Sequence, residues 1–96
     1  MSKKSLPIHE WTFLSNHGHV LVHLSREKDA RIRDIAQAVG ITERSVQAIV
    51  SELVDFGYLD VSRVGRRNQY SINTKLTFRH PAEKSKPIGA LLKIFS

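Results

Sequence analysis

The chain has 96 residues, of which 41% are hydrophobic and 25% charged, and its formal net charge is +6. This length and composition fit one small globular domain. The sequence contains no cysteine, which excludes disulfides, thiolate metal sites and cysteine nucleophiles. No apolar run approaches the roughly 18 residues of a membrane span, and no signal-peptide core is visible near the start. We therefore expect a cytoplasmic protein.

The first quarter of the chain predicts a flexible terminus followed by one helix. Residues 1–10 are polar and basic, and we expect them to be poorly ordered. The next segment carries three apolar side chains, those of Trp11, Phe13 and Leu14. Since these side chains are unfavourable in water, we expect them to pack against the core or against a second subunit. Ser15 can then cap a helix over about residues 17–26.

Residues 31–57 predict two short helices joined by a tight turn. A brief strand could form at residues 31–33, before a first helix over about residues 34–39. Gly40 supplies the left-handed conformation that ends this helix. Thr42 is the expected N-cap of the second helix. The second helix carries an apolar stripe with the spacing of a buried helix face, formed by Val46, Ile49, Val50, Leu53 and Val54.

The excess positive charge follows these helices. Residues 1–57 hold seven Lys/Arg and seven Asp/Glu, whereas residues 58–96 hold eight and two. This asymmetry suggests a surface that faces a polyanion, with a basic solubilising tail as the alternative. Alternating residues predict a hairpin over residues 58–73, with Gly65 in its turn. Residues 74–96 follow as a basic linker and a short amphipathic helix, expected to serve in dimerisation or packing. The apolar positions of this helix are Ile88, Leu91, Leu92 and Phe95.

This order of elements predicts an α+β, mainly helical fold in which residues 11–73 form a DNA-binding domain. The second helix of such a pair projects its polar face outward, where it fits the major groove of double-stranded DNA. We expect Arg44 and Gln47 to read bases, and Thr42 and Ser45 to contact phosphates. The hairpin arginines are expected to meet phosphates or a narrow minor groove. The predicted DNA-binding residues are Thr42, Arg44, Ser45, Gln47, Ala48, Arg63, Arg66, Arg67 and Asn68.

The charge of the second helix argues in the other direction. Three acidic residues, Glu43, Glu52 and Asp55, outnumber its single arginine. Carboxylates near phosphates are unfavourable, so Glu52 and Asp55 must lie away from the DNA backbone or contact bases such as cytosine. The alternative interpretation is a winged-helix protein-interaction module that does not bind DNA.

Three segments carry a resemblance to a known group of proteins. Residues 31–47, together with Gly57-Tyr58-Leu59 and residues 64–70 (Val-Gly-Arg-Arg-Asn-Gln-Tyr), resemble winged helix-turn-helix transcriptional regulators of the MarR and ArsR grouping, particularly small single-domain ones. The likeness covers about residues 11–80. It implies a dimeric repressor with a recognition helix over about residues 42–56 and an arginine-rich wing tip at residues 63–68. ArsR-type metal sensors commonly use cysteines, which this chain lacks. MarR-type proteins are longer, with flanking helices that form the dimer and the ligand pocket.

The histidines and the remaining polar residues predict neither a metal site nor an active site. His19 and His23 lie four residues apart, a spacing that can seat zinc on one helix face, but no Asp or Glu stands beside them to complete the site. We therefore predict no metal and no cofactor, with a metal- or ligand-gated sensor as a third option. The sequence shows no phosphate-binding glycine loop and no nucleophile paired with a base. We expect a protein that is not an enzyme, whose effector is unknown.

Overall fold

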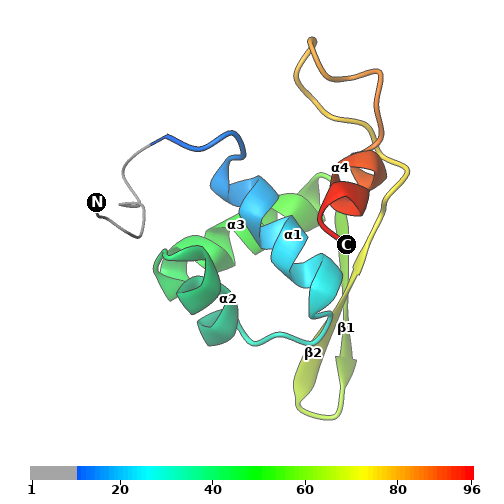
Figure 1. The fold of residues 1–96 in the computed structure, drawn as a ribbon. Coiled ribbons are helices and arrows are strands. Elements are labelled where there is room, and N and C mark those ends of the chain that lie inside the picture. The colour runs from blue at the N-terminus through cyan, green and yellow to red at the C-terminus, as the bar shows by residue number, and fades with distance from the viewer. Residues whose placement is uncertain (1–10) are drawn as a thin grey trace.

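The computed structural model describes residues 11–96, which fold into four helices and one antiparallel two-stranded sheet (Figure 1). In chain order the elements are α1 (Asn16–Arg26), α2 (Ile32–Val39), α3 (Glu43–Asp55), β1 (Leu59–Val64), β2 (Arg67–Ile72) and α4 (Ile88–Ile94). This architecture confirms the predicted α+β class with a hairpin and a short C-terminal helix. The flexible terminus expected at residues 1–10 lies outside the described residues. Within residues 11–96, every helix is too short or too polar to cross a membrane.

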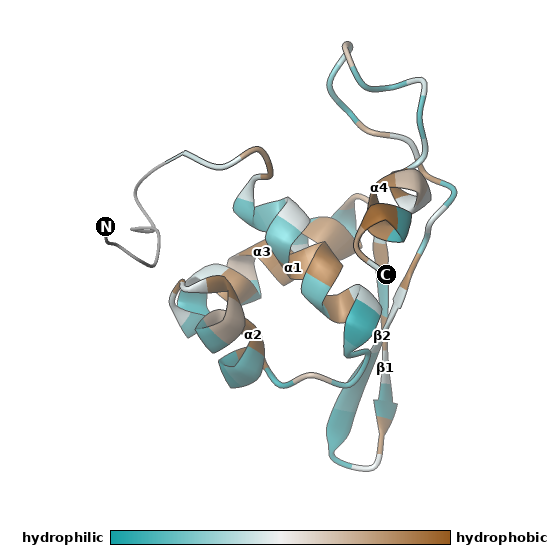
Figure 2. Ribbon diagram, viewed as in Figure 1, coloured by the Kyte–Doolittle hydropathy of each residue, from teal (hydrophilic) through white to brown (hydrophobic). Residues whose placement is uncertain are grey.

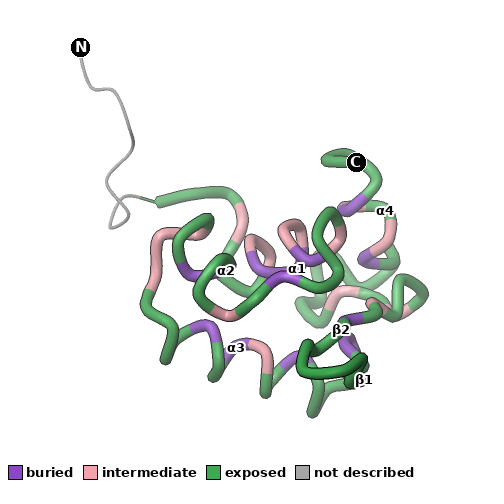
Figure 3. The backbone as a smooth tube through the Cα atoms, turned by 90° about the horizontal axis from the view of Figure 1, so that it is seen from below, coloured by how far each residue is buried: buried purple, intermediate pink, exposed green. Residues whose placement is uncertain are grey.

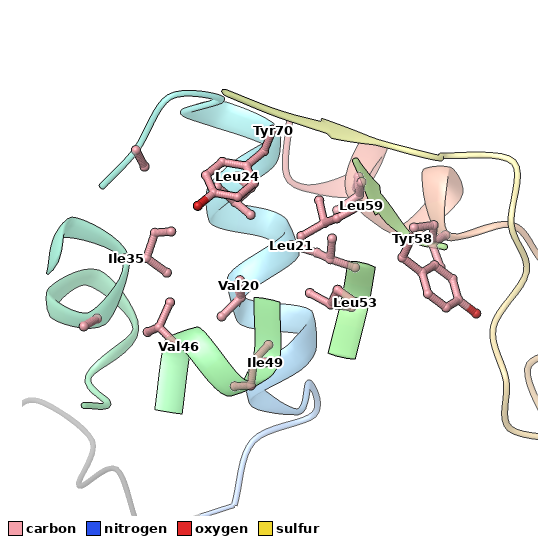
Figure 4. Close-up of a cluster of buried hydrophobic side chains, with 14 residues drawn as sticks. Val20, Leu21, Leu24, Ile35, Val46, Ile49, Leu53, Tyr58, Leu59 and Tyr70 are labelled. Carbon is pink, nitrogen blue, oxygen red and sulfur yellow. The ribbon is translucent and has the colours of Figure 1, made fainter. Parts of the chain in front are cut away.

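The hydrophobic core is built around α1, which packs against α2, α3, α4 and β2 (Figure 4). Its buried side chains are those of Val20, Leu21 and Leu24, and they share one face because Leu24 lies one helical turn after Val20 and Leu21. Figure 3 shows buried positions recurring along α1 and α3, separated by intermediate positions on α1 and mostly by exposed positions on α3. The core residues contributed by the other elements include Ile35, Ala36, Val46, Ile49, Leu53, Leu59, Tyr70, Ile88 and Leu92. Each fully buried aliphatic side chain contributes about 1.5–3 kcal/mol.

The turn between α2 and α3 sets the angle at which α3 is presented. Gly40 adopts a left-handed conformation with a φ of 87°, and the amides of Gly40 and Ile41 both donate to the carbonyl of Ala36. These bonds satisfy carbonyl groups that the end of a helix leaves free. The Thr42 hydroxyl oxygen then accepts from the Ser45 amide at 3.0 Å and caps α3. The predicted turn and both of its signals are therefore confirmed.

Substituting Gly40 should test this turn directly. We expect Gly40→Ala to lower the free energy of unfolding by about 1–2 kcal/mol, because a Cβ is unfavourable in the left-handed conformation. Urea denaturation followed by circular dichroism would measure the change. Gln37→Ala, at an exposed position of the same helix, should change stability by less than about 0.5 kcal/mol. An unchanged midpoint for Gly40→Ala would contradict the described turn.

The β1–β2 hairpin is joined to the core at one end and free at the other. Along β1 and β2 alternate residues share a face, so Leu59 and Tyr70, both buried, lie on the same face as Arg63 and Asn68 nearer the turn. We call this the inner face of the hairpin. The turn itself contains Gly65, whose φ is 64°. The hairpin thus carries apolar residues at the end that packs against the core and basic residues at its free end.

The C-terminal segment packs onto the same core. The Ile88 amide donates to the Leu76 carbonyl at 2.8 Å, and the Gly89 amide donates to the Thr74 carbonyl at 3.0 Å. Gly89 is required for this approach, because a Cβ there would lie 2.9 Å from the Thr74 Cβ. The Arg26 guanidinium donates to the Phe95 carbonyl and fixes the end of α4 against α1. Residues 74–96 are therefore continuous with the core of residues 11–73 in this structure.

Two predicted element boundaries are wrong. The brief strand expected at residues 31–33 is absent from the structure, because Ile32 and Arg33 already form the first turn of α2, which starts two residues earlier than predicted. Asp34 lies in this first turn, where its negative charge stabilises the helix by interacting with the positive end of the helix dipole. Within residues 11–96, one backbone hydrogen bond joins β2 to the connection between α1 and α2: the Tyr70 amide donates to the Lys28 carbonyl at 2.8 Å.

Four apolar residues are less buried than the sequence predicts. Trp11 and Phe13 are 76% and 94% exposed, and they pack edge to face on one another instead of on the core of this chain. Val54 is 38% exposed because it is rotated about 100° around α3 from the buried Leu53. Phe95 follows the end of α4 and is 37% exposed. Trp11 and Phe13 remain available to a second subunit.

Candidate nucleic-acid interface

One face of α3 is polar and points away from the core. Arg44, Gln47, Ala48 and Ser51 are all exposed, and their spacing of three, four and seven residues places them on one side of the helix. The buried residues of α3 occupy the opposite side. Within residues 11–96, neither Arg44 nor Gln47 makes a side-chain hydrogen bond or ion pair. Their donors and acceptors are therefore available to a ligand.

The two residues predicted to contact phosphates at the start of α3 are bonded to one another. Thr42 accepts from the Ser45 amide, and its hydroxyl donates to the Ser45 hydroxyl oxygen at 2.9 Å. The Thr42 proton is thus used inside the cap, whereas the Ser45 hydroxyl keeps its own proton for an outside acceptor. Both residues are exposed. Of the two, Ser45 is the better placed to donate to a phosphate.

The acidic residues of α3 are distributed unevenly around the helix. Glu52 lies toward α1, where its carboxylate contacts His17 Nε2 at 2.7 Å. Asp55 lies eleven residues, or about three helical turns, after Arg44 and therefore continues the outward face. The sequence predicts that both carboxylates lie away from the DNA backbone or contact bases, and of the two only that of Glu52 lies toward α1. Asp55 places negative charge at the C-terminal end of the face.

The free end of the hairpin carries three arginines and one asparagine, all exposed. Arg63 pairs with Asn68 across the sheet, and Arg66 lies in the turn after Gly65. In the described part of the chain, the side chains of Arg63 and Arg66 make no hydrogen bond or ion pair. Figure 2 shows the lower part of β2 as hydrophilic. Arg63 and Arg66 therefore give this end of the hairpin positive charge that no carboxylate of residues 11–96 neutralises.

The third hairpin arginine, Arg67, has a structural partner. Its guanidinium donates to the Asp29 carbonyl oxygen at 2.7 Å, and the Asp29 carboxylate lies 3.7 Å from the same nitrogen. The Tyr70 amide donates to the Lys28 carbonyl a short distance along the same strand. Together these bonds fasten β2 to the connection between α1 and α2. Sequence spacing could not reveal this partnership, because the two residues are separated by 38 positions.

A hollow of about 250 Å³ lies between this connection and the hairpin, and we call it the basic hollow. Its lining residues are Asp29, Ala30, Arg31, Ile32, Arg63, Arg66, Arg67, Asn68 and Tyr70. Four guanidinium groups and one carboxylate therefore surround it. The sequence pattern indicates the hairpin arginines as candidate ligands but gives no such signal for Arg31. Arg31 joins them because β2 lies beside the connection between α1 and α2, to which Arg31 belongs.

A second, larger hollow of about 610 Å³ lies between α1, α3 and the segment that precedes α4. Apolar residues that line it include Leu21, Leu53, Phe56, Tyr58, Phe78 and Ile88, while His17, Glu52, His80 and Glu83 supply polar groups. The outward face of α3 does not contribute to it. No group of three or more His, Asp or Glu side chains in residues 11–96 is arranged to hold a metal ion. His19 contacts Asn16 at 3.2 Å instead.

The chain matches no model of a known protein family, and no curated protein was found to be similar to it in sequence.

Proposed function

We propose that this protein is a sequence-specific, double-stranded DNA-binding regulator of transcription with a winged helix-turn-helix fold. In this proposal α3 is the recognition helix and the β1–β2 hairpin is the wing. The observation that carries it is the presence of an exposed polar face on α3 together with a hairpin end where Arg63 and Arg66, two of its three arginines, have no partner within residues 11–96. The protein acts as a repressor and carries out no catalysis.

The dimensions of α3 support a major-groove reader. From Arg44 to Ser51 the outward face spans about 10 Å along the helix at 1.5 Å per residue. The side chains on this face are short or flexible, and the major groove is about 12 Å wide. Arginine pairs with guanine and glutamine with adenine in this groove, while the Ala48 methyl suits a thymine methyl. Affinity that does not depend on sequence then comes mainly from the hairpin, because α3 itself carries more acidic than basic residues.

We also propose that two copies of the chain bind DNA together. The exposed Trp11 and Phe13 and the 72% exposed Ile94 offer apolar surface on residues that the core does not use. A two-fold dimer would bind a nearly palindromic site with half-sites about 34–36 Å apart. Light scattering of the protein alone and of its Phe13→Ser variant would test this. A monomeric mass for the unmodified protein at micromolar concentration would contradict it.

Arg44→Ala should relax the sequence preference at one base pair of each half-site. Loss of a bidentate arginine–guanine contact should reduce discrimination there by about 1–3 kcal/mol while leaving other positions unchanged. Site selection from randomised duplexes, repeated with the variant, would measure this. Glu43→Ala, which changes a neighbouring residue that lies off the outward stripe, serves as the control.

Titration of the intact protein with randomised or genomic duplex DNA at low salt tests the proposal as a whole. Binding that weakens steeply with salt is expected. Failure to bind any duplex would overturn the proposal. If such a protein nevertheless retained a specific protein from a cell lysate, the protein-interaction interpretation of the winged helix would replace it.

A further inference from the structure

The basic hollow has more positive than negative side chains around it and can therefore accept an anion from a ligand. Four arginines line it, and Asp29 is its single acidic residue. Figure 1 shows that the connection between α1 and α2 begins beside the hairpin and that the hairpin extends below it. Three of the lining arginines, Arg63, Arg66 and Arg67, belong to the free end of the hairpin. In residues 11–96, Arg63 and Arg66 have no carboxylate partner. Like charges gathered in this way repel one another unless an anion enters.

The position of Arg63 shows which hairpin face takes part. Arg63 lies on the inner face with Asn68 and Tyr70, and Tyr70 packs into the core beside the connection that carries Arg31. The hollow is therefore formed by two elements that the core holds in place. At about 250 Å³ it holds several water molecules of about 30 Å³ each, so a phosphate group can replace them.

We propose that the basic hollow binds a single backbone phosphate of the DNA duplex, with Arg31 and Arg63 as its principal ligands. This inference rests on the proposed DNA-binding function and adds a contact from Arg31, in the connection before α2, that the sequence did not predict. Guanidinium groups favour phosphate because their planar donors match its oxygens. A phosphate between Arg31 and Arg63 also connects the start of the helix pair α2–α3 with the β1–β2 hairpin.

In this proposal the Asp29 carboxylate also lowers the affinity of the hollow for phosphate. Its backbone carbonyl oxygen holds Arg67 at 2.7 Å, whereas its carboxylate lies 3.7 Å away and adds mainly negative charge to the hollow. The side chain of Asp29 is therefore separable from the bond that positions the hairpin. Asp29→Asn keeps the backbone acceptor and removes the charge that opposes a phosphate.

The test is a scan of a selected duplex in which one phosphate at a time is replaced by an uncharged methylphosphonate. For the unmodified protein, we expect one position in each half-site where neutralisation weakens binding about tenfold, as loss of a charge-assisted hydrogen bond should. At that position the double variant Arg31→Ala with Arg63→Ala should lose sensitivity, with a change below about twofold, because the arginines that would contact the phosphate are already missing. Each single variant should show an intermediate change. Arg33→Ala removes the same charge from an exposed position of α2 outside the hollow and should keep the full effect.

Asp29→Asn should strengthen binding of the unmodified duplex about threefold to tenfold and should leave the hairpin in place, as amide chemical shifts of β2 would show. Free inorganic phosphate is the other possible occupant of the basic hollow and is tested separately. If inorganic phosphate shifts the amide signals around the hollow and duplex DNA does not compete with it, the site takes a free anion and the inference is overturned. If no methylphosphonate position depends on Arg31 or Arg63 although the duplex binds, the inference also fails while the proposed function stands. Absence of any duplex binding by the unmodified protein would instead remove the proposed function itself.

Discussion

Alanine at both Arg63 and Arg66 should weaken binding of duplex DNA of any sequence by about 60-fold at 0.1 M monovalent salt. Each phosphate contact adds about 0.9 to the slope of log affinity against log salt, so losing two of them lowers the slope by about 1.8 over the tenfold range below 1 M. Both side chains are exposed and neither has an internal partner in the described chain, so the fold should be unaffected. Fluorescence anisotropy at several salt concentrations would measure both quantities.

A double substitution in the segment before α4 provides the matched control. Lys84→Ala with Lys86→Ala changes the net charge by the same amount, and this segment projects from the opposite end of the molecule to the hairpin tip (Figure 1). We expect a small effect on affinity from this control and almost no change in slope. Equal losses from the two double variants would show that only net charge matters and that the hairpin has no special role.

Ile35→Ala should lower the free energy of unfolding by about 2–5 kcal/mol, because it leaves a cavity where a completely buried side chain now packs. Ile35 lies on α2 and faces Val20 of α1 and Val46 of α3 (Figure 4). A domain of this size has a total stability of about 5–15 kcal/mol, so the loss is a large fraction of it. The midpoint of thermal unfolding should fall by about 10–30 °C.

Val54→Ala is the corresponding control on α3. Its side chain is 38% exposed, and alanine is the better helix former, so the two small effects should nearly cancel. Differential scanning calorimetry of both variants would compare them under one condition. If Ile35→Ala left the midpoint within a few degrees of the unmodified protein, α2 would not be packed as described.

The features that sequence predicted well are set by neighbouring residues. Gly40 and Thr42 mark the turn between α2 and α3 through backbone conformation and capping, and both act within three or four positions. Gly65 marks the hairpin turn in the same way. The predicted strand at residues 31–33 failed because a short β-branched and basic run fits a helix start as well as a strand, and the packing of α2 decided between them.

The features that sequence missed depend on residues brought together from distant positions. Arg31 joins the hairpin arginines, and Asp29 holds Arg67, only because β2 lies beside the connection between α1 and α2. The contact between His17 and Glu52 spans 35 positions and likewise has no local signal. The apolar character of Trp11 and Phe13 predicts burial but does not say against which surface, and in this chain they are exposed.

The bonds from β2 to the connection between α1 and α2 have a geometrical consequence for any duplex that the protein binds. Because Lys28 and Asp29 hold β2 at two points, the separation between Arg44 on α3 and Arg66 in the hairpin turn is fixed by the protein before binding. A duplex bound by both arginines must place a base edge near Arg44 and a backbone phosphate near Arg66, at the distance that the protein sets between them. Sequences that alter groove width would be rejected even where every contacted base is correct.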